Sequence, residues 1–137
     1  MRGLKPKLTA IEGGLSKVPA APRDLDADAR AEWRKAAKQL VDKGFLHTSH
    51  LATLELFAIA MGQVRKLQPI ANREPAVIAT ANGSMKTNPT HTMLARYMTV
   101  AKNCAAELGL TPAGQHRKGM KQPEGGQSDD YWSRLGL

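Results

Sequence analysis

The stretch "TANGSMKTNPTHTMLARYMTVAKNCAAELGLTP", residues Thr80–Pro112, decides the fold of this chain. Asn82-Gly83 is the strongest short signal of a β-hairpin, because both residues tolerate the positive φ angles of a two-residue type I′ turn. Asn88-Pro89 is typical of a helix start, with Asn as the N-cap and proline at the first helical position. A β-hairpin should therefore lead almost directly into a helix.

The sequence also predicts the limits of these elements. Strands are expected at about residues 76–81 and 84–88, where the turn interrupts a stretch with β-branched residues. The helix should run from Pro89 to Leu108, because Gly109 suits the left-handed residue that follows many helices. A lone hairpin is marginal in water, so it has to lean on the helices or on a neighbouring subunit.

The long helix has apolar residues at heptad-like spacing. Such spacing indicates that the helix packs nearly parallel to another helix, in the same subunit or in the next. Aromatic residues make up only 4% of the 137 residues, so a thin core would gain from burial between subunits. We therefore predict a homo-oligomer held together by five residues of this helix: Leu94, Tyr97, Ala101, Cys104 and Leu108.

Two amphipathic helices are predicted before the hairpin. The first can be capped by Asp26 or Asp28, and the second can begin at Thr48 or Ser49 and should be limited by Pro69. The link between them is short. The short link predicts an αα-hairpin or a helix-turn-helix unit. These two arrangements differ in the angle at which the helices cross, which cannot be read from the sequence.

Together these elements predict a mainly α fold, made of a helical hairpin, a short β-hairpin and one long helix. Residues 1–23, interrupted by Pro and Gly, are expected to form a flexible basic arm. Residues 24–112 would form the helical core and oligomerisation domain, and residues 113–137 a flexible polar tail. Tyr131 and Trp132 near the end of the tail suit a peptide that docks on a partner, and can equally fold back on the domain.

The charge of the chain favours a polyanionic partner. The formal net charge is +8, which suits binding to nucleic acid, most simply to double-stranded DNA. The alternative is an ordinary basic protein whose cations only face solvent. The predicted DNA contacts are cations of the arm and of the first helix: Arg2, Lys5, Lys7, Lys17, Arg23, Arg30, Arg34 and Lys38.

The sequence offers no set of residues for catalysis, a cofactor or a metal. Gly13-Gly14 is not followed by Gly-Lys-Ser/Thr, so it does not form a phosphate-binding loop. His47 and His50 could share a helix face, but no third metal ligand is predicted. The acids before the first helix suit helix capping better than a two-metal nuclease. A single Cys104 fits a reducing cytoplasm, and no apolar run is long enough to cross a membrane.

Three blocks, in order, resemble the small subunit of phage terminase. "RGLKPKLTAIEGG" (residues 2–14) resembles the basic, Lys-Pro-bearing opening of that family. "ADARAEWRKAAKQLVDKGFLHTSHLATLELFA" (residues 27–58) resembles its Ala-rich helix with a central Trp, followed by a second helix. The block from Thr80 to Arg117 resembles its Asn-Gly turn, Asn-Pro helix start and Leu-Gly-Leu-Thr-Pro ending.

This resemblance implies a non-enzymatic factor that acts in the host cytoplasm. Small subunits of this kind recognise viral DNA at the packaging site, assemble into rings and deliver the DNA to the terminase large subunit, which carries the ATPase and the nuclease. The alternative is a small helix-turn-helix-like DNA-binding regulator, a monomer or a dimer, which light scattering would distinguish from a ring.

Overall fold

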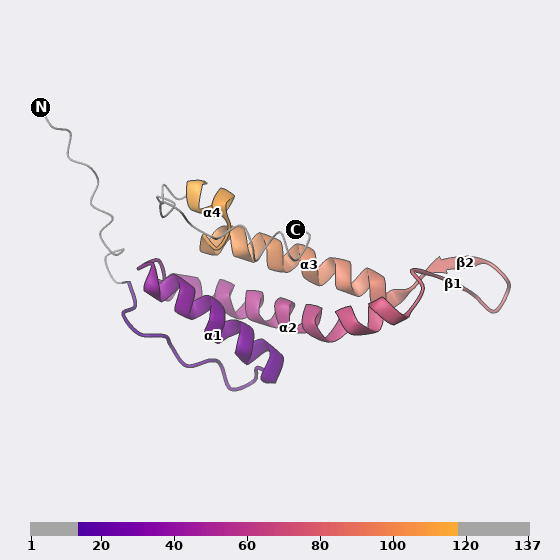
Figure 1. Ribbon diagram of the computed structural model, residues 1–137, viewed down its shortest axis with the longest axis horizontal. Helices are drawn as coiled ribbons and strands as arrows, with labels where there is room; N and C mark the ends of the chain where they lie inside the picture. Colours follow the sequence, from indigo (N-terminus) through magenta and orange to yellow (C-terminus); the bar gives the residue numbers. More distant parts are fainter. Residues whose placement is uncertain (1–13, 118–137) are drawn as a thin grey trace, which may run out of the picture.

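The computed structural model describes residues 14–117 (Figure 1). It confirms the predicted mainly α fold with a two-stranded antiparallel hairpin. The elements, in chain order, are α1 (Ala27–Asp42), a short 3-10 helix η1 (Thr48–His50), α2 (Leu51–Arg73), β1 (Val77–Ala79), β2 (Met85–Thr87), α3 (Pro89–Leu108) and α4 (Pro112–Arg117).

Helix α1 begins where the acidic cap was predicted. The side chain of Asp26 accepts a hydrogen bond from the backbone N–H of Ala29, at 3.0 Å from Oδ1. The apolar side of α1 then packs on α2, with Trp33 only 2% exposed. The approach is close at Gly62 of α2, where an added Cβ would lie 2.9 Å from the backbone nitrogen of Ala29. Gly62 therefore sets how near the two helices come.

The second helical segment begins at Thr48, one of the two predicted starts, through the short 3-10 helix η1. His47, rather than Thr48 or Ser49, is the N-cap of η1, which leads into α2. Nδ1 of His47 accepts the backbone N–H of Ser49 at 3.1 Å, and Nδ1 of His50 accepts the backbone N–H of His47 at 3.2 Å. An imidazole nitrogen thus accepts the backbone hydrogen bond that a Ser or Thr oxygen usually accepts at the start of a helix.

Pro69 does not end α2, which continues to Arg73. Proline removes one backbone donor from the helix, but the added turn gains packing, since Ala71 is buried with Val64 and Leu94 of α3. The expectation that Pro69 would limit the helix was therefore wrong. Burial against α3 outweighed the local preference.

The hairpin is confirmed, but its turn is longer than predicted. Ala79 pairs with Met85, and the backbone N–H of Thr80 donates to the carbonyl of Ser84 at 2.7 Å, which leaves three residues in the loop. Only Gly83 in this loop has a positive φ, of 83°. The two-residue type I′ turn is thus corrected to a three-residue loop with glycine in the left-handed position.

Helix α3 has the predicted limits. Asn88 caps it by accepting the backbone N–H of Thr90 at 3.0 Å. The amide of Asn88 also donates to the carboxylate of Glu74 at 2.9 Å, which joins the base of the hairpin to the end of α2. Gly109 ends the helix with a φ of 78°, and Leu110 packs back over the last turn at 2% exposed. The short α4 then begins one residue before the predicted tail.

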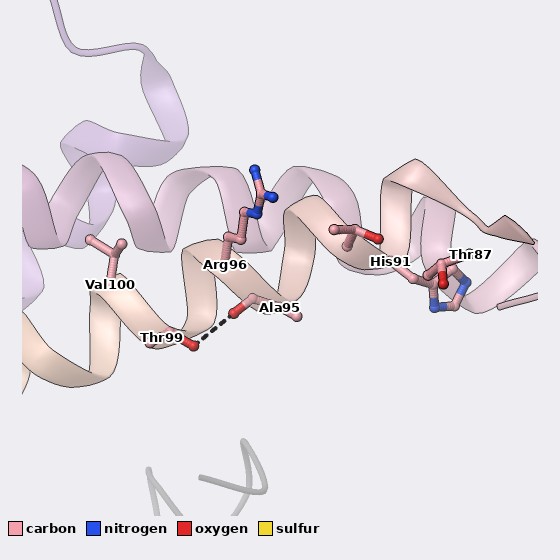
Figure 2. A pocket seen from close by; sticks show the side chains of 7 residues that line it. Thr87, His91, Ala95, Arg96, Thr99 and Val100 are labelled. Carbon is pink, nitrogen blue, oxygen red and sulfur yellow. Dashed lines mark hydrogen bonds between the residues drawn. The ribbon is translucent and has the colours of Figure 1, made fainter.

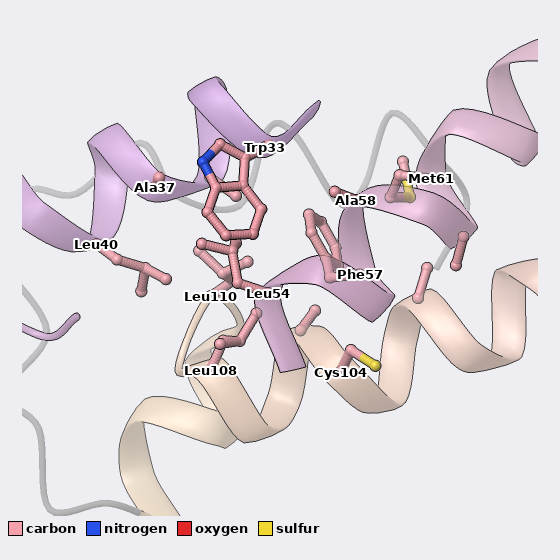
Figure 3. Packing of buried hydrophobic residues seen from close by; sticks show 14 of the residues in the cluster. Trp33, Ala37, Leu40, Leu54, Phe57, Ala58, Met61, Cys104, Leu108 and Leu110 are labelled. Atoms are coloured by element: carbon pink, nitrogen blue, oxygen red, sulfur yellow. The ribbon is translucent and has the colours of Figure 1, made fainter. Parts of the chain in front are cut away.

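The buried side chains form two clusters of unequal size. The larger one joins α1, the first half of α2 and the last half of α3, and includes Trp33, Phe57 and Leu108 (Figure 3). The smaller cluster joins the last half of α2 to the first half of α3 through Val64, Ala71 and Leu94. We call these regions the three-helix end and the two-helix stalk. The β-hairpin lies at the tip of the stalk (Figure 1).

Candidate nucleic-acid interface

The segment before α1 lies against that helix and carries two of the predicted DNA contacts. The indole Nε1 of Trp33 donates to the carbonyl of Pro19 at 2.9 Å, and the guanidinium of Arg30 donates to the carbonyl of Arg23 at 2.8 Å. The side chains of Lys17 and Arg23 are exposed. From residue 14 on, the segment predicted as an arm is therefore held on the three-helix end.

Three predicted contacts lie along one side of α1. Arg30, Arg34 and Lys38 are spaced by four residues, so they follow one another on the helix surface over about 12 Å. Arg34 and Lys38 are exposed, and no salt bridge joins either of them to a carboxylate within residues 14–117. Arg30 is half-buried, and its guanidinium is already used to hold the preceding segment. Arg34 and Lys38 are thus the two cations of this row that remain available.

Other cations near α1 are paired with acids. Nε of Arg65 donates to Oε1 of Glu32 at 2.9 Å, and the Glu32 residue is only 4% exposed. Nζ of Lys35 lies 4.0 Å from the same oxygen. Lys66 forms a salt bridge with Asp26. Sequence reasoning missed the Arg65 and Lys66 pairs, because their partners lie 33 and 40 positions away on another helix.

Asp26 has a structural role at this end of the molecule. The hydrogen bond from the Lys66 ammonium, together with the backbone N–H of Ala29, lowers the pKa of the Asp26 carboxyl. Asp26 therefore stays ionised as both the cap of α1 and the partner of Lys66. Within residues 14–117, no group of three or more His, Cys, Asp or Glu side chains could hold a metal ion.

The residues predicted to mediate oligomerisation lie mostly inside the chain. Four of them are buried, and α2 of the same chain covers the side of α3 that carries them. Tyr97 is half-buried at the junction of the two clusters. Burial raises the pKa of the Cys104 thiol, with a smaller contribution from the nearby Glu107 carboxylate. Heptad spacing allowed α3 to pack on a helix of the same subunit or of the next one. The structure shows packing on α2 of the same subunit, and a role of these residues in assembly stays a prediction.

Large apolar side chains are exposed elsewhere, mainly on α2, on the hairpin and on α3. No helical period or turn signal singled them out, because their exposure depends on which faces the other helices leave uncovered. They are Leu56, Ile59 and Ile70 of α2, Val77 and Met85 of the hairpin, and Met93 and Val100 of α3. Part of α3 also lines a shallow pocket, with Thr87, His91 and Ala95 among its residues (Figure 2).

Five predicted site residues lie outside the described part of the chain. They are the arm cations Arg2, Lys5 and Lys7 and the tail aromatics Tyr131 and Trp132. Their roles stay predictions. Among residues 14–117, no helix has the length and apolar character that crossing a membrane requires.

The fold and the surface define a small, mainly helical protein with an apolar two-helix stalk and with exposed cations on one outer helix that form no salt bridge within residues 14–117. The family model described as "Phage terminase, small subunit" matches residues 29–125, which is well over half of the chain. The chain therefore belongs to the phage terminase small subunit family, and this membership gives it a general role in phage genome packaging. The searches of curated proteins and of solved structures returned no match.

Proposed function

We propose that this chain binds double-stranded viral DNA at the packaging site and delivers it to the terminase large subunit, in the host cytoplasm. The chain itself would be non-enzymatic, and the large subunit would supply the ATPase and nuclease. Family membership supports this assignment, since DNA and the large subunit are the general partners of such a protein.

The row of cations on α1 is the observation that supports DNA binding most directly. Arg34 and Lys38 face solvent with no salt bridge to a described carboxylate, so a phosphate could contact them without displacing an acid. Lys17 and Arg23 extend the cationic surface along the segment in front of α1. Arg30 would contribute mainly by holding that segment in place. The remaining proposed contacts are the arm residues Arg2, Lys5 and Lys7.

Oligomerisation into a ring would strengthen such binding. A few phosphate contacts in each subunit add up when several subunits hold the same DNA. The exposed apolar side chains of α2 and of the hairpin suit contacts between subunits, because a two-helix stalk cannot bury them itself. Of the five α3 residues first predicted for assembly, Leu94 and Tyr97 would then act chiefly by holding the stalk together behind that surface. Ala101, Cys104 and Leu108 would act by packing α3 into the three-helix end.

Salt-dependent binding to DNA tests the proposed interface. Replacing Arg34 and Lys38 with Gln should weaken binding and reduce the slope of log K against log salt by about 0.9 for each lost phosphate contact. The matched control replaces Arg73 and Lys86 with Gln, which removes two exposed cations at the stalk end instead. Fluorescence anisotropy with packaging-site DNA and with unrelated DNA measures both. An equal change of slope in the two double variants would contradict an interface on α1.

The mass of the purified protein tests the ring. Light scattering over a range of concentrations should find a species larger than a dimer. A dimer with nothing larger at any concentration would favour the helix-turn-helix-like regulator instead. Adding the large subunit should give a heavier complex that is lost when Tyr131 and Trp132 are both replaced with Ala, if those residues dock there.

A further inference from the structure

The side of α3 that faces away from α2 has no partner over most of its length within the described chain. Thr92, Ala95, Arg96 and Thr99 lie on this side and are exposed or half-exposed, and Val100 borders it at 42% exposed. We call these five residues the outer face of α3 (Figure 2). The opposite side of the helix is buried against α2 in both clusters.

The outer face is more apolar than its threonines suggest. The hydroxyl of Thr99 donates to the carbonyl of Ala95 at 3.0 Å, as the dashed line in Figure 2 shows. The hydroxyl of Thr92 donates in the same way to the carbonyl of Asn88 at 3.4 Å. Because both hydroxyls are bonded to their own helix, the methyl groups are left for contact with a partner.

The described chain leaves α3 on this same side. An added Cβ at Gly114 of α4 would lie 2.1 Å from the carbonyl oxygen of Ala106, so α4 packs directly on the last turns of α3. Helical spacing places Ala106 in line with Ala95 and Thr99, at intervals of four and seven residues. Along the helix, about 21 Å separate Ala106 from Thr92 at the far end of the outer face. The chain beyond Arg117 therefore starts near one end of the outer face.

We propose that the C-terminal segment of the same chain, Asp129–Leu137, docks on the outer face of α3. Residues 118–132 can span about 50 Å when extended, which is more than twice the length of the face. Tyr131 and Trp132 supply the apolar surface that the face fits. Because this segment is joined to α4 by a short stretch of the same chain, its effective concentration at the outer face is high. It is therefore better placed to occupy the face than a separate molecule.

Charge supports the same occupant. Asp129 and Asp130 directly precede the two aromatic residues, with one cation, Arg134, after them. On α3 the exposed Arg96 belongs to the outer face and the exposed Lys102 borders it, and the exposed acid Glu107 lies beyond them toward the C-terminal end of the helix. An acidic pair followed by aromatics therefore meets a cation-bordered apolar surface.

The docking does not depend on DNA binding or on membership of a ring. It does bear on the proposed contact with the large subunit. Tyr131 and Trp132 cannot touch α3 and another protein at the same time, so the large subunit would have to displace the segment from α3.

Acrylamide quenching of tryptophan fluorescence in the full chain tests the docking. The chain has two tryptophans, and Trp33 is 2% exposed, so the quenchable fluorescence reports Trp132. In the native chain we expect little quenching. Ala95→Glu on the outer face should make about half of the fluorescence quenchable, and Trp132→Phe in that variant should remove the quenchable part. Ala31→Glu, at an exposed alanine on α1, is the matched control and should change nothing.

A charge exchange makes the test specific. Arg96→Glu should free Trp132, and adding Asp129→Lys with Asp130→Lys should protect it again. Circular dichroism and the melting temperature of each variant check that the helices stay folded. The proposal would be overturned if Trp132 were equally quenchable in the native chain and in the Ala95→Glu variant. It would also be overturned if dilution of the native protein removed the protection of Trp132, because that would mean docking on another copy of the chain.

Discussion

The three-helix end and the two-helix stalk are built from the same pair of helices, yet they hold α2 and α3 in different ways. At the three-helix end, α1 covers α2, and side chains such as Phe57 and Leu54 are almost completely buried. In the stalk, α2 and α3 pack only on each other among the described residues, and three residues make up the buried cluster. The number of helices around α2, rather than its own sequence, decides how much of it is buried.

The comparison also separates two kinds of surface. The three-helix end has a complete core and presents cations, which suit contact with phosphate and do not need a partner for stability. The stalk presents Ile70, Val77 and Met85 to solvent. A two-stranded hairpin beyond the last buried cluster gains little from its own chain. We therefore expect the three-helix end to be stable alone and the stalk to be stabilised by assembly.

The largest effect should come from removing the indole at the three-helix end. Trp33→Ala should lower the free energy of unfolding by about 3–5 kcal/mol, because it leaves a cavity and frees the carbonyl of Pro19. Leu94→Ala in the stalk should cost less, about 2–3 kcal/mol, because an open two-helix layer can collapse onto the gap. Urea unfolding at low protein concentration measures both. Equal costs would show that the stalk is packed as tightly as the three-helix end.

The next effect concerns the close approach of α1 and α2. Helix propensity alone predicts that Gly62→Ala stabilises α2 by about 1 kcal/mol. The Cβ would lie 2.9 Å from the nitrogen of Ala29, so we expect a net loss of about 1–2 kcal/mol instead. The sign of the change in thermal or urea unfolding decides between the two. A stabilised variant would mean that α1 can move away without cost.

A gain is expected where α4 packs on α3. Gln115 is 1% exposed, and neither its amide nitrogen nor its amide oxygen has a hydrogen-bond partner among residues 14–117. Gln115→Met keeps a similar shape without the buried polar atoms and should raise the free energy of unfolding by about 1 kcal/mol. Gln115→Glu is the contrasting variant and should destabilise the fold. Loss of stability in the Met variant would show that the amide is satisfied in solution.

The smallest effect on the folded chain should come from the hairpin. Val77 and Met85 are 50% and 65% exposed, so replacing both with Thr should change the free energy of unfolding by less than about 0.5 kcal/mol. If the stalk mediates assembly, the same variant should shift the mass distribution toward smaller species in light scattering. An unchanged mass distribution would show that the hairpin is not part of the assembly surface. The exposed apolar side chains of α2 would then be left as the candidate contacts between subunits.

Local signals predicted most of the secondary structure. Asp26, the Asn88-Pro89 pair and Gly109 each fix a helix end through hydrogen bonds or φ angles within a few residues, so they could be identified without tertiary structure. The end of α2 was predicted wrongly because a distant contact decided it: packing on α3 carried the helix past Pro69. The sequence also did not indicate that a histidine, His47, caps the start of η1.

The candidate site was predicted less completely than the fold. Helical spacing alone placed Arg30, Arg34 and Lys38 on one side of α1. It could not show that Arg30 is used to hold the backbone of Arg23, because that contact depends on the path of the preceding segment. It also could not show that α2 of the same chain fills the apolar side of α3.

The sequence by itself determined where α1 begins, where α3 begins and ends, that a hairpin precedes α3, and which side of each helix is apolar, because turns, caps and helical periodicity are local properties. Only the tertiary structure decided which apolar side meets which. It pairs Glu32 with Arg65 and buries Leu94 and Ala101 within the chain, while it leaves Arg34 and Lys38 in solvent. Those outcomes follow from contacts between residues far apart in the chain, which local patterns do not encode.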